Sequence, residues 1–147
     1  MRFRSTLQLI ALVAVAAACV APTRTEAAYQ AKASDTAQAV VSAARTVLLT
    51  ARVAAADRSF GPTVAVSVAD AEGDAASARD AFTSIQPPDT ASDAIRRHLL
   101  PDVQLAVDVI ELVRIAARRN QLDRLPAIAA PLGPISARLD QFATSYG

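Results

Sequence analysis

The chain has 147 residues, of which 52 % are apolar and only 4 % aromatic, so its interior must be built from small side chains. About 120 residues remain after the leader described below, enough for one domain with a modest core and too few for two. Removing Arg2 and Arg4 with that leader leaves 13 basic and 14 acidic residues, and this near-balance excludes a nucleic-acid-binding field.

The first 21 residues carry the three parts of an export signal. Arg2 and Arg4 precede an apolar run from Leu7 to Ala18, and small residues follow the run. The run is too short for a transmembrane span, which needs about 20 apolar residues. We therefore predict that residues 1–18 are a signal peptide and that the protein leaves the cytoplasm.

The apolar run ends in Ala16, Ala17, Ala18 and Cys19. This ending resembles a bacterial lipoprotein signal, in which the cysteine is acylated and becomes the first residue of the mature protein. It departs from the usual pattern at Ala16, where leucine is commonest. The many arginines and alanines, with Lys32 as the only lysine, are similar to proteins of high-GC bacteria such as actinobacteria. The resemblance covers the leader alone, and it implies a lipid anchor at Cys19 on the outer face of the cytoplasmic membrane.

Plain secretion is the alternative. Cleavage after Ala21 or Ala27 would discard Cys19, which has no second cysteine in the chain for a disulfide. Residues 19–34 are polar and alanine-rich without a firm apolar period, so they predict a flexible tether spanning roughly 20 Å. Residues 35–147 are then the folded domain.

The first helix is predicted to begin at Asp35, with Gln38 able to complete a capping box. Beyond it, small apolar residues recur at spacings of three and four, and this predicts one buried helical seam: Ala37, Val40, Ala44, Val47, Ala51 and Ala54. Leu49 falls on the opposite, polar side and is expected to be exposed.

Pro62 is well placed to open the second helix. The alternation of Val64, Val66 and Val68 resembles a strand, but apolar residues keep the helical four-three spacing from Val64 to Ile85. A strand would not keep that spacing for three heptads, so we predict a helix.

The longest predicted helix spans Thr90–Asn120 and is apolar over more than half its circumference. Such an arc needs more than one neighbour, so this helix is predicted to lie at the centre of the fold. Pro101 is expected to kink the helix without ending it, because apolar residues keep to one face on both sides of it. The predicted arc consists of Val103, Leu105, Ala106, Val109, Ile110, Leu112, Val113 and Ala116.

The last apolar series runs from Leu125 to Tyr146. Pro131, Gly133 and Pro134 do not fit a regular helix, so we predict either a strongly bent helix or two nearly collinear pieces meeting near Gly133. Four antiparallel helices joined by short turns define the predicted fold class, an all-α, up-down-up-down four-helix bundle.

This topology brings bulky residues to one end of the bundle: His98, Phe82, Phe142 and Tyr146, with Tyr29 as a further candidate. One interpretation is a site for a small apolar ligand with one titratable group, which would need a closed cavity of about 300 Å³ or more. The alternative, which we favour, is that these side chains only fill the wide end of a bundle of small residues.

The opposite end collects basic residues, tempered by two aspartates: Arg58, Arg118, Arg119 and Arg124, with Asp57 and Asp123. These arginines could meet anionic phosphate on a lipid or an envelope polymer. We favour the simpler interpretation, a solvated end that serves the helix dipoles.

Nothing in the sequence has the pattern of a reaction centre. A lone histidine without a Glu-x-x-His pair is a poor metal site, and Asp70, Glu72 and Asp74 lack the spacing of a calcium loop. His98 has no partnered serine and acid, and there is no Gly-x-Ser-x-Gly elbow or phosphate loop. We therefore expect no catalytic residue, cofactor or metal, and predict a non-enzymatic protein that binds an envelope or protein partner. The alternative is a carrier or sensor of a small apolar ligand near His98.

Overall fold

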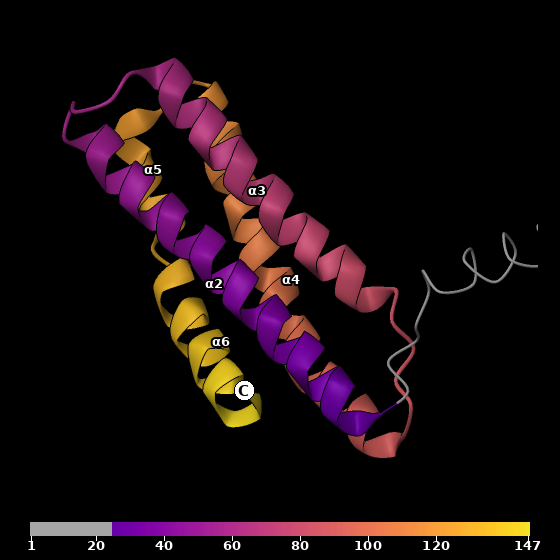
Figure 1. The fold of residues 1–147 in the computed structure, drawn as a ribbon. Helices are drawn as coiled ribbons and strands as arrows, with labels where there is room; N and C mark the ends of the chain where they lie inside the picture. Colours follow the sequence, from indigo (N-terminus) through magenta and orange to yellow (C-terminus); the bar gives the residue numbers. More distant parts are fainter. Residues whose placement is uncertain (1–24) are drawn as a thin grey trace, which may run out of the picture.

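The computed structural model describes residues 25–147, and within this range every regular element is helical (Figure 1). The prediction of an all-α fold is confirmed, and Val64–Val68 lie in a helix. The elements are α2 (Glu26–Ala55), α3 (Gly61–Thr83), α4 (Thr90–Arg118), the 3-10 turn η2 (Leu122–Arg124), α5 (Leu125–Ala129) and α6 (Leu132–Tyr146). The predicted signal peptide, residues 1–18, and Cys19 lie outside the described residues.

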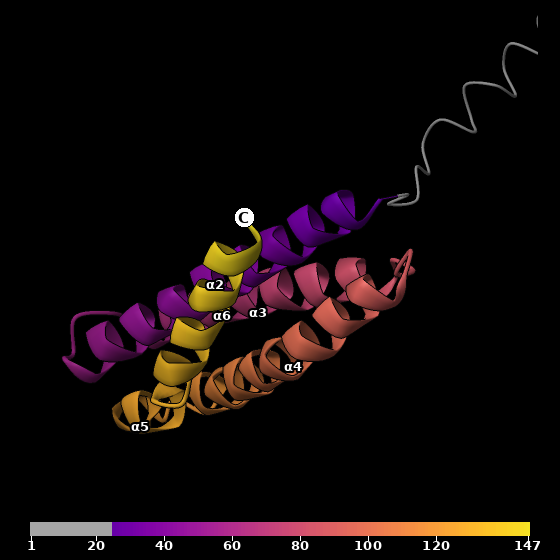
Figure 2. The same ribbon diagram turned by 90° about the horizontal axis from the view of Figure 1, so that it is seen from below.

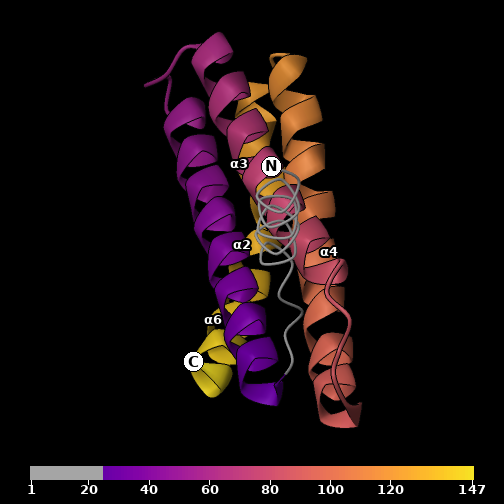
Figure 3. The same cartoon turned by 45° about the vertical axis from the view of Figure 1, so that its right-hand side comes forward.

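The long helices α2, α3 and α4 run side by side in alternating directions (Figures 1 and 3). α3 and α6 each pack against both α2 and α4 and barely touch each other. The centre of the fold is therefore shared by α2 and α4, whereas the sequence had assigned it to the third helix alone.

α2 begins at Glu26, so the predicted start at Asp35 is wrong. The hydroxyl of Thr25 caps the helix and accepts a hydrogen bond from the backbone N of Ala28 at 3.2 Å. Tyr29 and Ala33 are fully buried. Alanine favours helix, and the tertiary contacts of these two buried residues stabilise additional turns. The helix therefore begins earlier than the capping residues near Asp35 indicated. The predicted tether of residues 19–34 is therefore wrong from Glu26 onward, and residues 19–24 lie outside the described range.

α4 continues through Pro101, as predicted, and ends at Arg118. Its N-cap is Asp89, whose carboxylate accepts a hydrogen bond from the backbone N of Ser92 at 2.7 Å. The predicted start of the helix at Thr90 is confirmed.

The buried arc of α4 is rotated from the predicted one. Leu105 and Leu112 were placed on that arc, yet they are 46 % and 57 % exposed, while Val107 is buried. α3 packs on the Val107 side of α4, where Arg114 forms an ion pair with Glu72 of α3. The predicted arc was wrong because the spacing of apolar residues identifies an apolar face of the helix but does not specify where the neighbouring helix lies.

The last segment is divided into α5 and α6. Ala130 and Pro131 join them and keep right-handed helical dihedrals, so the chain follows one interrupted helical path. The interruption precedes the predicted joint at Gly133, because Pro131 and Pro134 both lack the backbone N–H that a continuous helix requires. α6 crosses the face formed by α2 and α4 (Figure 2).

One cluster of buried side chains connects all of these helices, and its members differ along the chain. α2 and α3 contribute mainly alanine and valine, whereas α4, α5 and α6 contribute most of the leucine and isoleucine. Small side chains on the first two helices are balanced by larger ones on the others.

Candidate functional site

The bulky residues predicted to meet at one end form two separate groups. Phe82 packs on Tyr29, with ring centroids 5.2 Å apart. His98 lies at 5.4 Å from Phe142 in an edge-on arrangement, and Phe142 lies at 4.6 Å from Tyr146. The groups are separate because α3 supplies Phe82 and α6 supplies Phe142, and these two helices barely touch.

The Tyr29–Phe82 pair belongs to the core. Both side chains are essentially inaccessible to solvent. Burial raises the pKa of the Tyr29 phenol, and the positive charge of nearby Arg96 opposes that shift. The guanidinium of Arg96 donates instead to the carbonyls of Ile85 and Thr83, at 2.9 and 2.8 Å. Tyr29 Oη has no hydrogen-bond partner among the described residues, and neither ring of the pair is open to solvent.

The second group lines a cleft between α4 and α6. The cleft holds about 290 Å³ and is lined by His98, Phe142 and Tyr146 among others, but not by Phe82 or Tyr29. It is open to solvent and His98 is exposed, so it is not the closed cavity of about 300 Å³ that the carrier hypothesis requires.

A charged pair forms one wall of this cleft. Arg138 of α6 donates from Nε to both carboxylate oxygens of Asp102 on α4, at 3.1 and 3.0 Å. These hydrogen bonds raise the pKa of Arg138 above its usual value. The guanidinium is thus already occupied by Asp102, and the surface left for a ligand is mainly the aromatic edge.

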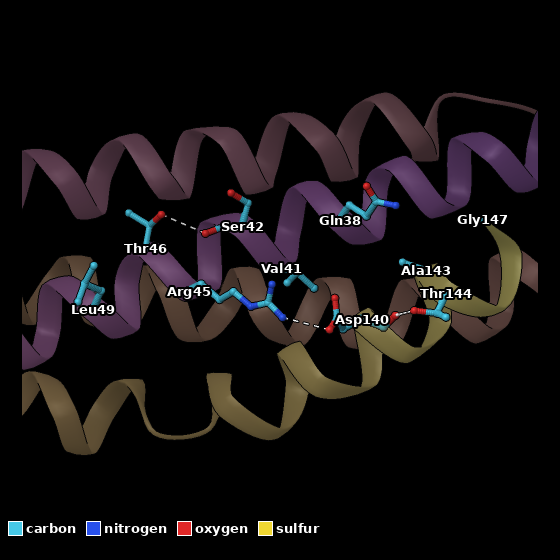
Figure 4. A pocket seen from close by; sticks show the side chains of 10 residues that line it. All are labelled: Gln38, Val41, Ser42, Arg45, Thr46, Leu49, Asp140, Ala143, Thr144 and Gly147. Atoms are coloured by element: carbon cyan, nitrogen blue, oxygen red, sulfur yellow. Dashed lines mark hydrogen bonds and ion pairs between the residues drawn. The ribbon is translucent and has the colours of Figure 1, made fainter.

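A larger groove runs between α2 and α6 (Figure 4). It holds about 790 Å³ and is open along its length. The exposed Leu49 gives it apolar surface beside the nearly buried Val41, and Arg45 reaches across to Asp140 at 3.1 Å. Ser34 ties the two helices together near the end of α6 by donating to the carbonyl of Ala143 at 3.1 Å.

Sequence reasoning missed this groove. Leu49 was correctly predicted to be exposed, and its side chain is 61 % exposed, but no groove was predicted beside it. The groove depends on how α6 crosses α2, and the spacing of apolar residues does not specify a crossing angle.

The basic end has the composition predicted for it. Arg58, Arg118, Arg119 and Arg124 are all exposed, and none forms an ion pair with another residue of the described range 25–147. Phe60, which the sequence reasoning did not single out, lies between the end of α2 and the start of α3 at this end and is 83 % exposed. Its signal in the sequence was its position directly before Gly61 and Pro62, where a helix begins and a side chain points away from the core.

Residues 25–147 contain no group of three or more His, Cys, Asp or Glu side chains arranged to hold a metal ion. None of the helices described here is long and apolar enough to cross a membrane. No protein-family model matches this chain, and no curated protein or solved structure matches it significantly. The geometry above is therefore the basis for any functional inference.

Proposed function

We propose that this chain is an exported, non-enzymatic helical bundle that acts by binding a protein or envelope partner. A lipid on Cys19 would hold it on the outer face of the cytoplasmic membrane. The observation that supports binding best is the open groove between α2 and α6, where polar and apolar side chains of both helices are accessible to a partner.

The proposed architecture is an up-down-up-down four-helix bundle. Its members are α2, α3, α4 and the interrupted segment made of α5 and α6. The packing of α3 and α6 on opposite sides of the α2–α4 pair supports this arrangement. α6 is short beside α2, with 15 residues against 30, and this difference leaves part of α2 uncovered next to the groove.

The groove has the chemistry of a protein-binding surface. It combines the exposed Leu49 and the edge of Val41 with the hydroxyls of Ser42 and Thr46 (Figure 4). The Arg45–Asp140 ion pair crosses it, and both side chains are more than half exposed. Because such exposed pairs contribute little to stability, a partner can replace this one without unfolding the protein.

The groove is tested by photo-crosslinking in the native envelope. A crosslinker at Leu49 should capture a defined partner, and Arg45→Glu, which reverses one charge of the groove, should abolish that capture. The matched control places the crosslinker at Leu105, an exposed leucine of α4 remote from the groove lining. Equal capture from both positions, or capture insensitive to Arg45→Glu, would contradict a specific site in the groove.

The anchor is tested separately. Glu26 begins α2 only seven residues after Cys19, so a lipid there would hold the start of α2 close to the bilayer. Wild-type protein should incorporate a palmitate analogue and fractionate with membranes, whereas Cys19→Ser should lose the label and leave the membrane fraction. Val20→Ala is the neighbouring control and should behave as wild type. An unlabelled wild type found in the medium would favour the alternative, plain secretion.

A second candidate function is the binding of a small apolar ligand at the cleft beside His98. The aromatic cluster of His98, Phe142 and Tyr146 supports it, because a group of aromatic rings favours flat apolar molecules. Titration with small aromatic compounds should shift the imidazole NMR signals of His98, the single histidine of the chain. His98→Ala should weaken binding and Lys32→Ala should not. The absence of saturable shifts at millimolar ligand would exclude this candidate.

A further inference from the structure

The end of the molecule opposite the start of α2 carries an exposed aromatic side chain within a group of arginines. This basic pole consists of Phe60 and four arginines: Arg58, Arg118, Arg119 and Arg124. It lies where α2 and α4 end and α3 begins, at the upper left in Figure 1.

Two turns of the same kind hold the pole together. α2 and α4 both end in a residue with left-handed dihedrals, Asp57 at φ 52° and Asn120 at φ 56°. In each turn the following residue donates back into the helix, Arg58 to the carbonyl of Val53 at 3.1 Å and Gln121 to that of Ala116 at 3.0 Å. These are Schellman-type ends, and they fix the direction in which the chain leaves each helix.

The start of α3, which follows the first turn, also touches the second turn. A side chain added at Gly61 would meet the amide oxygen of Asn120 at 2.6 Å, so the loop carrying Phe60 is packed against the loop following Arg119. The contact brings residues far apart in the sequence onto one surface. The aromatic ring and the arginines therefore lie at one end of the molecule, on segments that meet there.

The basic pole carries an excess of positive charge. Four arginines are opposed by Asp57 and Asp123, which leaves an excess of about two charges. The dipoles of the three helix ends at this pole, two C-terminal and one N-terminal, subtract roughly half a charge more. Because the arginines form no ion pair with other described residues, their charge is available to a partner.

We propose that the basic pole docks on the surface of an anionic phospholipid bilayer. Arginine pairs with lipid phosphate in a bidentate manner, and an aromatic ring at the tip of a loop can enter the interface between headgroups and acyl chains. A soluble polyanion would satisfy the arginines but offers nothing apolar to Phe60, which is 83 % exposed. The combination of the ring with the charges favours a bilayer over a polymer.

The docking does not depend on a lipid at Cys19, because the pole belongs to the folded helices. It is therefore tested on the chain from Val20 onward, which keeps every described member of the hydrophobic core, Tyr29 to Ala143. Binding is measured by co-sedimentation with vesicles of phosphatidylcholine, either alone or with about one third phosphatidylglycerol.

Attraction to an anionic surface is about fivefold in affinity for each arginine near it, so an excess of about one and a half charges predicts about tenfold tighter binding to the anionic vesicles. Arg118→Gln with Arg119→Gln should remove that difference. Phe60→Ser should weaken binding to the anionic vesicles by about tenfold, as expected for a ring that enters the interface. About 1 M salt should release the protein because it shortens the screening length to roughly 3 Å.

Matched controls exist on the same chain. Lys32→Gln with Arg97→Gln removes the same charge from exposed positions away from the pole, and Leu49→Ser removes an exposed apolar side chain of the groove. Both should bind as the unmodified chain does. Equal binding to the two kinds of vesicle would overturn the proposal. It would also be overturned if the double variant at Lys32 and Arg97 lost as much vesicle binding as the double variant at Arg118 and Arg119. The proposal would also be overturned, in favour of a polymer, if the protein bound polyphosphate and Phe60→Ser did not change its binding to vesicles.

Discussion

Tyr29→Phe is the substitution that tests the packing at the start of α2 most directly. The ring of Tyr29 is fully buried against Phe82, and its hydroxyl has no hydrogen-bond partner among the described residues. A buried hydroxyl without a partner costs about 1–3 kcal/mol of desolvation. Removing the oxygen and keeping the ring should therefore raise the free energy of unfolding.

We expect a gain of about 1 kcal/mol, the lower end of that range, because Arg96 lies close enough to interact with the hydroxyl. A domain of about 125 residues has an unfolding entropy near 0.26 kcal/mol/K, so the melting temperature should rise by about 4 °C. Tyr29→Ala should instead lower the free energy of unfolding by about 3–5 kcal/mol, since it leaves a cavity where the ring was.

Both values are measured by urea unfolding and by calorimetry on the chain from Val20 onward. Tyr146→Phe serves as the control, because that side chain is only half-buried and should change stability little. If Tyr29→Phe lowers stability by 1 kcal/mol or more, the hydroxyl has a partner that the geometry does not reveal. If Tyr29→Ala is neutral, residues 26–34 are not packed, and the predicted tether would have to be restored.

The same phenol predicts a dependence on alkaline pH. Burial raises the pKa of Tyr29 from its usual 10.0, so the folded protein resists losing a proton that the unfolded chain gives up. The stabilisation is fully present below pH 10 and is lost as the pH rises through the pKa of the folded state. Tyr29→Phe should unfold at a higher pH than wild type. Coincident alkaline transitions would contradict the assigned burial.

Three further predictions concern single elements. Gly73 is exposed within α3, and no atom lies within 4 Å of a side chain added there. Gly73→Ala should therefore raise the free energy of unfolding, measured by urea unfolding, by about 1 kcal/mol. A decrease would contradict the open space at this position. Leu112→Ala should change that free energy by less than about 0.5 kcal/mol, because the side chain is 57 % exposed. Leu139→Ala should lower it by about 2–5 kcal/mol, because that side chain is only 1 % exposed. Equal effects would mean that Leu112 is buried, as the predicted arc had it. The hydrogen bond from the backbone N of Ser92 lowers the pKa of Asp89, so its stabilisation is present above the pKa of an unfolded aspartate and is lost as the pH falls. Asp89→Ala should flatten the acid side of a plot of melting temperature against pH, and an unchanged slope would count against this cap.

The sequence predicted the helical class and the position of most breaks, for reasons that lie in local chemistry. Pro62 and Pro131 restrict the backbone wherever they occur, and four-three spacing over three heptads fits only a helix. Leu49 was correctly predicted to be exposed because it faces away from a continuous seam. These features depend on neighbours in the chain, which the sequence contains.

The features that failed depend on neighbours in space. The start of α2 was missed because Tyr29 is held by Phe82, and Leu105 and Leu112 were misplaced because the position of α3 decides which side of α4 is covered. The candidate groove was missed for the same reason, since it exists only where α6 crosses α2. Periodicity identifies apolar faces, and the packing of whole helices determines which of them are covered.

The proposed lipid anchor and the basic pole together restrict how the protein can lie at a membrane. α2 has 30 residues and is therefore about 45 Å long, with the anchor near its first residue and the basic pole beyond its last. Residues between Cys19 and Glu26 reach at most about 25 Å when fully extended. A protein attached at both points to one bilayer cannot stand upright, because a tether of about 25 Å is shorter than α2, and lying flat it forms a layer about 20 Å thick. Neutron reflectometry of the lipidated protein on an anionic bilayer should give that thickness, and Arg118→Gln with Arg119→Gln should raise it toward 45 Å, the length of α2 standing upright. An upright layer in both cases would mean that the pole does not engage the membrane that carries the anchor.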